Sequence, residues 1–198
     1  MLERMAAASA SWLVSSNAIC EADWDVYKYG FHAMYNNIVD IASIAAIAHI
    51  AKMAPETIAY HIAFVPMRNT AGGWHAKTHL RCFALSTAMF AASLCGIAHT
   101  VPPYATAALG LFSAALVWAS APIEHENSPL KSEKRSHMKK LARTLSTVFA
   151  GVIALIEAFG AASFRWIALS LAYGMASQSL LALMALWQKR VSGKWEKT

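Results

Sequence analysis

A histidine and a cysteine that could form a catalytic pair lie in one polar stretch of the sequence. The segment 66–82 reads PMRNTAGGWHAKTHLRC and contains His75 and, seven residues later, Cys82. A cysteine attacks as its thiolate, so it needs a base to remove its proton and positive charge nearby to stabilise the anion. Lys77 and Arg81 carry such charge. The residue types and spacing therefore favour Cys82 as a nucleophile with His75 as its base.

The spacing between these two residues requires a bend in the chain. Thr78 is a good N-cap residue, which would place Cys82 in the first turn of a helix, where the helix dipole favours a thiolate. If residues 75–82 were one continuous helix, His75 and Cys82 would be about 10.5 Å apart along its axis, whereas proton transfer requires about 3 Å. We therefore expect His75 to precede the helix. Gly72 and Gly73 permit the positive φ angles of such a reversal, and a backbone N–H there could bind an oxyanion.

Two other roles are open for the same residues. His79 lies three positions before Cys82 and could act as the base in place of His75. The set His75, His79 and Cys82 has the spacing i, i+4, i+7, which on a continuous helix could hold zinc. The glycine pair argues against a helix through His75, so we predict neither a metal nor a cofactor.

The elements that position these residues are expected to lie in a membrane. The chain has 198 residues, of which 57% are hydrophobic and only 14% charged, against about 25% charged in soluble domains. Such a composition excludes a disordered chain, and three cysteines exclude a disulfide scaffold. We predict an all-α, polytopic membrane helical bundle with about four to six transmembrane helices. The expected spans are 30–54, 78–99, 104–121, 141–161 and 164–187.

The remaining segments are too short or too polar to span. Residues 2–27 mix tryptophans with acids and indicate one or two amphipathic helices along the interface. Residues 56–65, after Pro55, indicate a short amphipathic helix. The expected organisation is a single membrane domain over 1–198, made of an N-terminal interfacial segment at 1–29, a transmembrane bundle at 30–189 with a catalytic loop at 66–82 and a basic loop at 122–143, and a tail at 190–198.

Basic residues predict the orientation and the surface partner. The net charge is +6, from 17 Lys and Arg against 11 Asp and Glu. Most basic residues fall in the loop before the second span, the loop after the third and the C-terminal tail, so these segments are expected in the cytoplasm. On so apolar a chain, this charge indicates a lipid bilayer as partner and no nucleic acid.

At the polar stretch the chain resembles a known family. Arg68, the pair Gly72-Gly73, His75-Ala76 and Cys82 resemble the signature of the accessory gene regulator B family. These proteins are bacterial membrane cysteine endopeptidases that process the precursor of a quorum-sensing peptide. The stretch 121–130 (APIEHENSPL), followed by basic residues, is similar to the family's loop between its middle spans. One departure is His32, where the family commonly has an acid.

The resemblance implies a mechanism, a set of residues and a setting. Cys82, deprotonated by His75, would cleave the C-terminal segment from the precursor and form a thioester. A cysteine or serine of the precursor would then close a thiolactone or lactone ring. Arg68, Gly72 and Gly73 would support the site. Family precursors carry an acidic C-terminal tail, for which the basic loop offers a binding site. The family also implies a homodimer in the bacterial cell membrane. The residues expected to bind the tail are Lys131, Lys134, Arg135, Lys139 and Lys140.

A different class of function is also compatible with the sequence. Asp40 and Glu157 are acids inside expected spans, and intramembrane acids often mark a transport pathway. A small transporter or channel would need these two acids, and it would not need Cys82.

Overall fold

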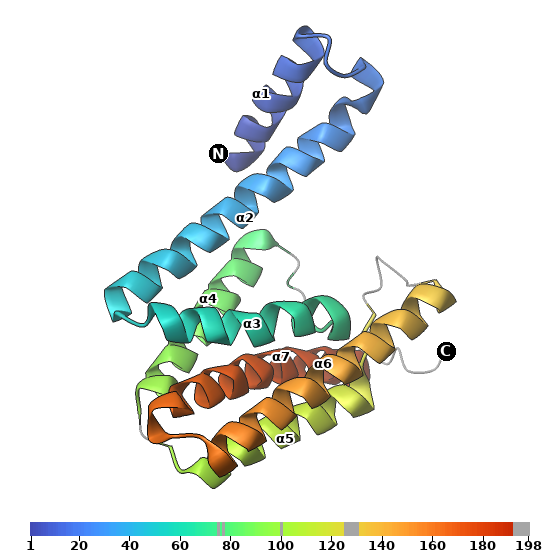
Figure 1. Ribbon diagram of the computed structural model, residues 1–198. Helices are drawn as coiled ribbons and strands as arrows, with labels where there is room; N and C mark the ends of the chain where they lie inside the picture. Colours follow the sequence, from blue (N-terminus) through green and yellow to red (C-terminus); the bar gives the residue numbers. More distant parts are fainter. Residues whose placement is uncertain (75, 77, 100, 125–130, 192–198) are drawn as a thin grey trace. The chain divides into compact units, whose positions relative to one another are not determined.

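The computed structural model describes residues 1–74, 76, 78–99, 101–124 and 131–191 (Figure 1). In these residues the chain forms seven α-helices and two short 3₁₀ helices, and no strand is present among them. Five of the helices are long and apolar enough to cross a membrane. The prediction of an all-α bundle with four to six transmembrane helices is therefore confirmed.

Residues 1–50 form a compact unit of their own, a helical hairpin. Helix α1 (Leu2–Ser15) is joined to α2 (Trp24–Ala51) through the 3₁₀ helix η1 (Glu21–Asp23). The indole Nε1 of Trp24 donates to the Ser11 hydroxyl at 3.1 Å, and Lys28 pairs with Glu3 at 3.3 Å. Helix α2 starts six residues before the expected position because nothing between Trp24 and Gly30 interrupts a helix, and Asp25 in its first turn complements the helix dipole.

Residues 51–198 form the second unit, in which α3 (Ala54–Ala71) is longer than expected. The sequence predicts a short helix ending before Pro66, but this proline lies inside α3. Helix α3 packs along α7 (Arg165–Val191), and Ala63 and Met67 are fully buried. Burial of this face stabilises the last turns of α3 despite the hydrogen bond that Pro66 cannot make. Helix α3 is not among the five candidate spans.

Helix α7 is the centre of the second unit. It packs against α3, α4 (His79–Ala98), α5 (Pro103–Ser120) and α6 (Ser132–Phe159). Small residues bring the backbones close together: a Cβ at Gly174 would collide with the Tyr60 carbonyl oxygen. Such close contacts are typical of helix packing in membranes, where dispersion forces drive association.

Helix α6 begins earlier than the sequence predicts, so the expected boundary between the basic loop and the span is wrong. The sequence predicts a loop to residue 143 and a span from 141, but the helix already begins at Ser132. No glycine or proline follows Ser132 until Gly151, and Glu133 in the first turn complements the helix dipole. Much of the basic segment is therefore displayed on a helix surface.

Glu157 makes a structural ion pair. Its carboxylate accepts from Arg165 Nε at 3.0 Å, and Arg165 Nη2 donates to the Val101 carbonyl at 2.8 Å. The Glu157 side chain is only 4% exposed. These bonds link the end of α6 to the start of α7 and to the turn before α5. Neutralisation by Arg165 gives Glu157 a structural role and weakens the case for a transport pathway through it.

Candidate active site

The start of α4 holds Cys82 as the sequence predicts. Thr78 is the N-cap, and its hydroxyl oxygen accepts from the Arg81 N–H at 3.4 Å. The backbone N–H of Cys82 donates to the Thr78 carbonyl at 3.1 Å. Cys82 therefore lies in the first turn of α4, and its side chain is half-buried. Its thiol is near the positive end of the helix dipole and still accessible to a substrate.

The glycine pair at the end of α3 adopts conformations that L side chains rarely take. Gly72 has φ 71° and Gly73 has φ 142°. A Cβ at Gly72 would collide with the Ile123 carbonyl oxygen, and a Cβ at Gly73 would collide with Nη1 of Arg68. Both positions therefore require glycine for conformation, and Gly72 also requires it for space.

The segment after α5 supports this turn from one side. Gly72 forms an isolated parallel bridge with Ile123, whose N–H donates to the Ala71 carbonyl at 2.8 Å. Ile123 is 8% exposed. The stretch that resembles the family's middle loop thus begins in direct contact with the predicted catalytic loop.

Arg68 is held by the turn that follows α3. Its Nη2 donates to the Trp74 carbonyl, while Nη1 lies beside Gly73 and has no hydrogen-bond acceptor in the part of the chain that the structure describes. Burial lowers the pKa of Arg68 from its usual value, and the negative charge of a Cys82 thiolate opposes this decrease. The Arg68 guanidinium is thus fixed at the turn that leads to α4.

The spacing predicts positive charge near Cys82 from Lys77 and Arg81, and the structure describes only Arg81 of these two residues. The Arg81 side chain is exposed on α4, where water screens its charge. Lys77 lies outside the described residues. The family resemblance, rather than spacing, identified Arg68.

Two residues of α7 complete the support of the turn, and sequence reasoning missed both. The side-chain amide of Gln178 donates to the Gly72 carbonyl. One helical turn further, the Leu181 carbonyl accepts from the Trp74 N–H at 2.9 Å. The available signal was a glutamine in the middle of an apolar span, since polar residues there usually have a specific partner.

The structure describes only one of the two histidines that could act as the base. His75, the predicted base, lies outside the described residues. His79 is the first residue of α4, and its ring stacks with Phe83 at a centroid distance of 6.5 Å. No group of three His, Cys, Asp or Glu side chains within the described ranges is arranged to hold a metal ion.

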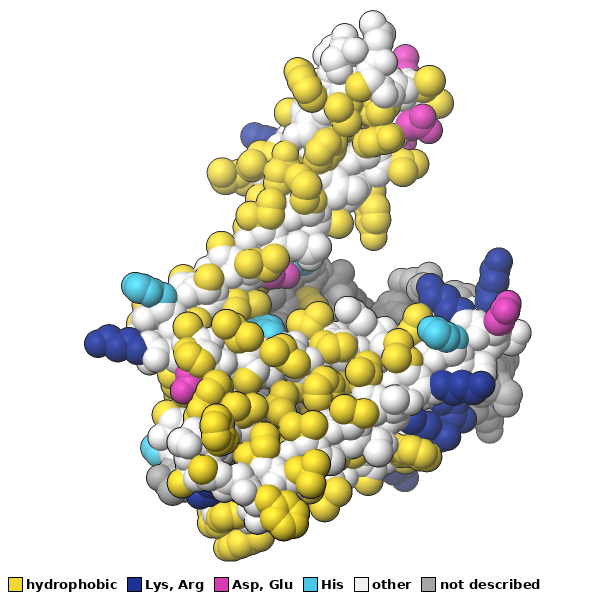
Figure 2. Space-filling view, in the orientation of Figure 1, with side chains coloured by type: hydrophobic (Ala, Val, Ile, Leu, Met, Phe, Trp, Pro, Cys, Tyr) yellow, Lys and Arg dark blue, Asp and Glu magenta, His cyan; other side chains and the backbone are white. Residues whose placement is uncertain are grey.

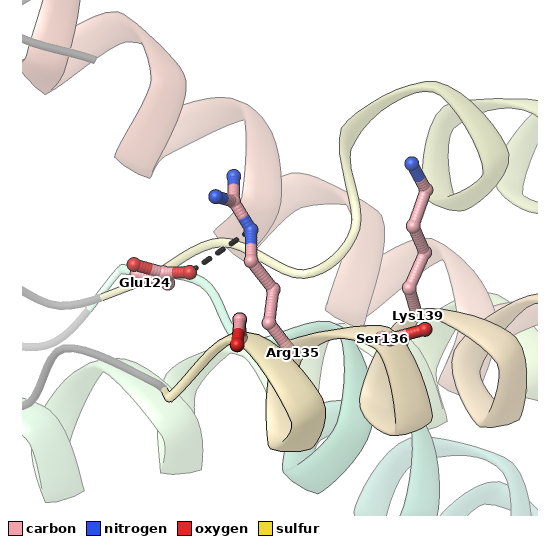
Figure 3. Close-up of a pocket in the computed structure, with 5 residues that line it drawn as sticks. Glu124, Arg135, Ser136 and Lys139 are labelled. Carbon is pink, nitrogen blue, oxygen red and sulfur yellow. Dashed lines mark ion pairs between the residues drawn. The ribbon is translucent and has the colours of Figure 1, made fainter.

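The basic residues of α6 border a hollow. Figure 2 shows Lys and Arg side chains gathered at the N-terminal end of this helix. The hollow has a volume of about 420 Å³, and Arg135 pairs with Glu124 across it at 3.1 Å (Figure 3). Four of the five predicted tail-binding residues project from α6 and are exposed; Lys131 directly precedes the helix and is also exposed. The residues that line the hollow are Glu124, Ser132, Arg135, Ser136 and Lys139.

Comparison with known proteins agrees with the motif. The family model described as Accessory gene regulator B matches residues 6–184. The chain belongs to the accessory gene regulator B family. An AgrB-like protein of Listeria innocua is 29% identical over 136 residues, which are 67% of this chain and 65% of that protein. An AgrB-like protein of Listeria welshimeri is 27% identical over 132 residues, 65% of this chain and 64% of that protein.

The matched region thus covers slightly less than two thirds of these AgrB-like relatives. No solved structure matches the chain. Family membership and five apolar helices together identify a multi-pass membrane protein.

Proposed function

We propose that this chain is a membrane cysteine endopeptidase that cleaves a peptide precursor through a thioester and releases a cyclic thiolactone or lactone for quorum sensing. The observation that carries this proposal is Cys82 in the first turn of α4, the helix that follows the turn in which the Trp74 carbonyl binds the Arg68 guanidinium. A thiolate at a helix N-terminus beside a fixed cation is the usual environment of a reactive cysteine. Membership of the accessory gene regulator B family supports the same activity.

The reaction needs two covalent steps. His75 takes the thiol proton of Cys82, and the thiolate attacks the carbonyl carbon of the scissile peptide bond. The carbon–nitrogen bond breaks, the proton on His75 passes to the leaving amine, and the N-terminal part of the precursor stays on Cys82 as a thioester. A thiol or hydroxyl within that part then attacks the thioester carbonyl, which closes the ring and returns the proton to Cys82.

Arg68 and the glycine pair have supporting roles in this proposal. The guanidinium stabilises the thiolate before attack and again when Cys82 leaves. Gly72 and Gly73 allow the turn that brings the end of α3 to the start of α4. A site at the membrane boundary also limits the access of water, which would otherwise hydrolyse the thioester.

The orientation follows from the positions of the basic residues. Alternating the five candidate spans puts the catalytic loop, the basic N-terminal end of α6 and the end of α7 on the same side. The positive-inside rule assigns that side to the cytoplasm. We therefore propose that the precursor is processed at the cytoplasmic face of the bacterial cell membrane.

The hollow beside α6 is the proposed binding site for the acidic tail of the precursor. Arg135 and Lys139 line it, and Glu124 directly follows Ile123, the residue that bridges Gly72. A tail bound here would therefore lie next to the catalytic loop. Electrostatic complementarity of this kind mainly favours association.

A charge-reversal experiment tests the tail-binding site. Replacing both Arg135 and Lys139 by glutamate is expected to raise the KM for the precursor by about tenfold, with kcat within about twofold, because binding is lost and the chemistry is untouched. A precursor whose tail acids are replaced by lysines is expected to restore the KM. The control is Arg4→Glu, an exposed charge in α1. An unchanged KM in the double variant would contradict the tail-binding role.

The covalent intermediate provides the direct test of the reaction. Membranes that contain the chain are incubated with the short peptide encoded next to it, in a version whose cysteines and serines are replaced by alanine so that the ring cannot close. Mass spectrometry is expected to find the N-terminal part of the peptide on Cys82, removable by hydroxylamine, together with the free C-terminal segment. Cleavage without any adduct on Cys82 would refute the thioester mechanism.

A further inference from the structure

We propose that Gln178 is a positioning residue of the active site, which holds the Gly72–Trp74 turn and, through it, the Arg68 guanidinium that the turn binds. The inference rests on the proposed function and extends it to a residue of α7 that is distant in sequence.

Gln178 is anchored at the centre of the second unit. It lies on α7, its side chain is fully buried, and its Nε2 donates to the Gly72 carbonyl, 106 residues away in the sequence. This carbonyl directly follows the end of α3, where helix carbonyls lack intrahelical partners. Within the apolar interior, the amide of Gln178 therefore satisfies a group that would otherwise be unpaired.

The turn connects Gln178 to the Arg68 guanidinium through a short series of hydrogen bonds. The turn is held by α7 at two points, since the Trp74 N–H donates to the Leu181 carbonyl at 2.9 Å. The Trp74 carbonyl in turn accepts from Arg68 Nη2. Loss of the bond to Gly72 would free one side of the turn, and the acceptor that orients Arg68 would move with it.

The oxygen of the Gln178 amide does not contribute to stability. This atom, Oε1, is buried and has no hydrogen-bond partner in the part of the chain that the structure describes. A buried acceptor without a partner is destabilising. Methionine, which has nearly the same size and shape, removes this unpaired acceptor but leaves the Gly72 carbonyl unpaired, so the two effects offset. We therefore expect Gln178→Met to leave the melting temperature nearly unchanged while it lowers activity.

The test compares this variant with a matched control on the same helix. Ser177→Ala also removes a buried hydrogen bond of α7, but its partner is Ser93 of α4 and not the turn. The full chain in native membranes is used throughout. The quantities measured are kcat and KM for the unmodified precursor peptide, the melting temperature, and the rate at which iodoacetamide alkylates Cys82, followed by mass spectrometry of the Cys82 peptide.

The expected result separates positioning from folding. For Gln178→Met, kcat should fall about 10- to 100-fold with KM within about twofold, as is typical when reacting groups are misplaced by about 1 Å. Alkylation of Cys82 should slow by about threefold or more, because the cation that stabilises the thiolate has moved. Ser177→Ala should keep wild-type kcat and alkylation.

If the wild-type chain is active, two outcomes would overturn the inference. Wild-type kcat and alkylation in Gln178→Met would show that the bond to Gly72 has no influence on the site. A fall in kcat that matches a fall in melting temperature would assign Gln178 a structural role. If the wild-type chain cleaves no precursor, the proposed function fails, and the alkylation rates still decide on Gln178: a slower rate in Gln178→Met supports the positioning role and an unchanged rate overturns it.

Discussion

Replacing Cys82 by alanine is expected to abolish processing of the precursor. The nucleophile and its base act as a unit, so removal of either typically lowers the rate at least about 10³-fold. The Cys82 side chain is half-buried in the first turn of α4 and has few packing contacts to lose, so the variant should fold and insert normally. The measurement is the fraction of precursor shortened on co-expression, determined by mass spectrometry.

The other cysteines and histidines provide the controls for this result. Cys20 and Cys95 are exposed, and Cys20→Ser or Cys95→Ser should leave the rate within about twofold. His75→Ala should be as inactive as Cys82→Ala, while His79→Ala should retain activity. A reversed pattern for the two histidines would make His79 the base, which is the alternative that spacing leaves open.

The Cys82 result also decides between the two classes of function. If Cys82→Ala still shortens the precursor, the assignment of Cys82 as the nucleophile is wrong. If no variant shortens it and Asp40→Asn stops the flux of an ion or solute, the chain is a transporter. Glu157 is less informative in this comparison, because its ion pair with Arg165 gives its replacement a structural effect.

Local signals predicted the parts of this fold that depend on neighbouring residues. The bounds of α4 and α5 agree with the sequence within about a residue because Thr78 caps one helix and prolines separate the two. The same local reasoning placed Cys82 in the first turn and assigned positive φ to Gly72 and Gly73. Each of these features is decided within a few residues of the chain.

Features that depend on tertiary packing were missed or misplaced. Helix α3 continues through Pro66 because its face is buried against α7, and sequence pattern alone does not reveal that partner. The start of α6 at Ser132 has the charge density of a connecting loop, and the sequence therefore predicts a loop there. The contact between Gln178 and Gly72 joins residues 106 positions apart, and no periodicity in one sequence indicates such a pair.

Replacing Arg68 is the second change with a large expected effect. Arg68→Met keeps an unbranched side chain but removes the guanidinium, and with it the charge and the bond to the Trp74 carbonyl. Loss of a fixed cation beside the reacting atoms typically costs about 10²- to 10³-fold in kcat, so we expect processing to fall by at least about 100-fold. Methionine removes the buried Nη1, which has no acceptor within the described ranges, but it leaves the partly buried Trp74 carbonyl without its donor. Because these two effects offset, the melting temperature should change little.

Two further variants, Arg68→Lys and Arg81→Ala, show whether the site requires a positive charge alone or a guanidinium at position 68. Lysine restores the charge but not the planar fork that places Nη2 on the Trp74 carbonyl and Nη1 beside Gly73. Arg68→Lys should therefore recover less than about a tenth of the lost activity. Arg81→Ala removes an exposed charge one residue from Cys82 and should change the rate less than about threefold.

The pattern of these three variants tests the electrostatic role of Arg68 itself. Full rescue by lysine would mean that charge alone matters, and the geometry of the turn would be incidental. A large effect of Arg81→Ala with a small effect of Arg68→Met would assign the stabilising charge to α4, as spacing alone suggests. The expected order, with Arg68→Met most impaired, Arg68→Lys nearly so and Arg81→Ala active, follows only if a guanidinium fixed by the turn stabilises the thiolate of Cys82.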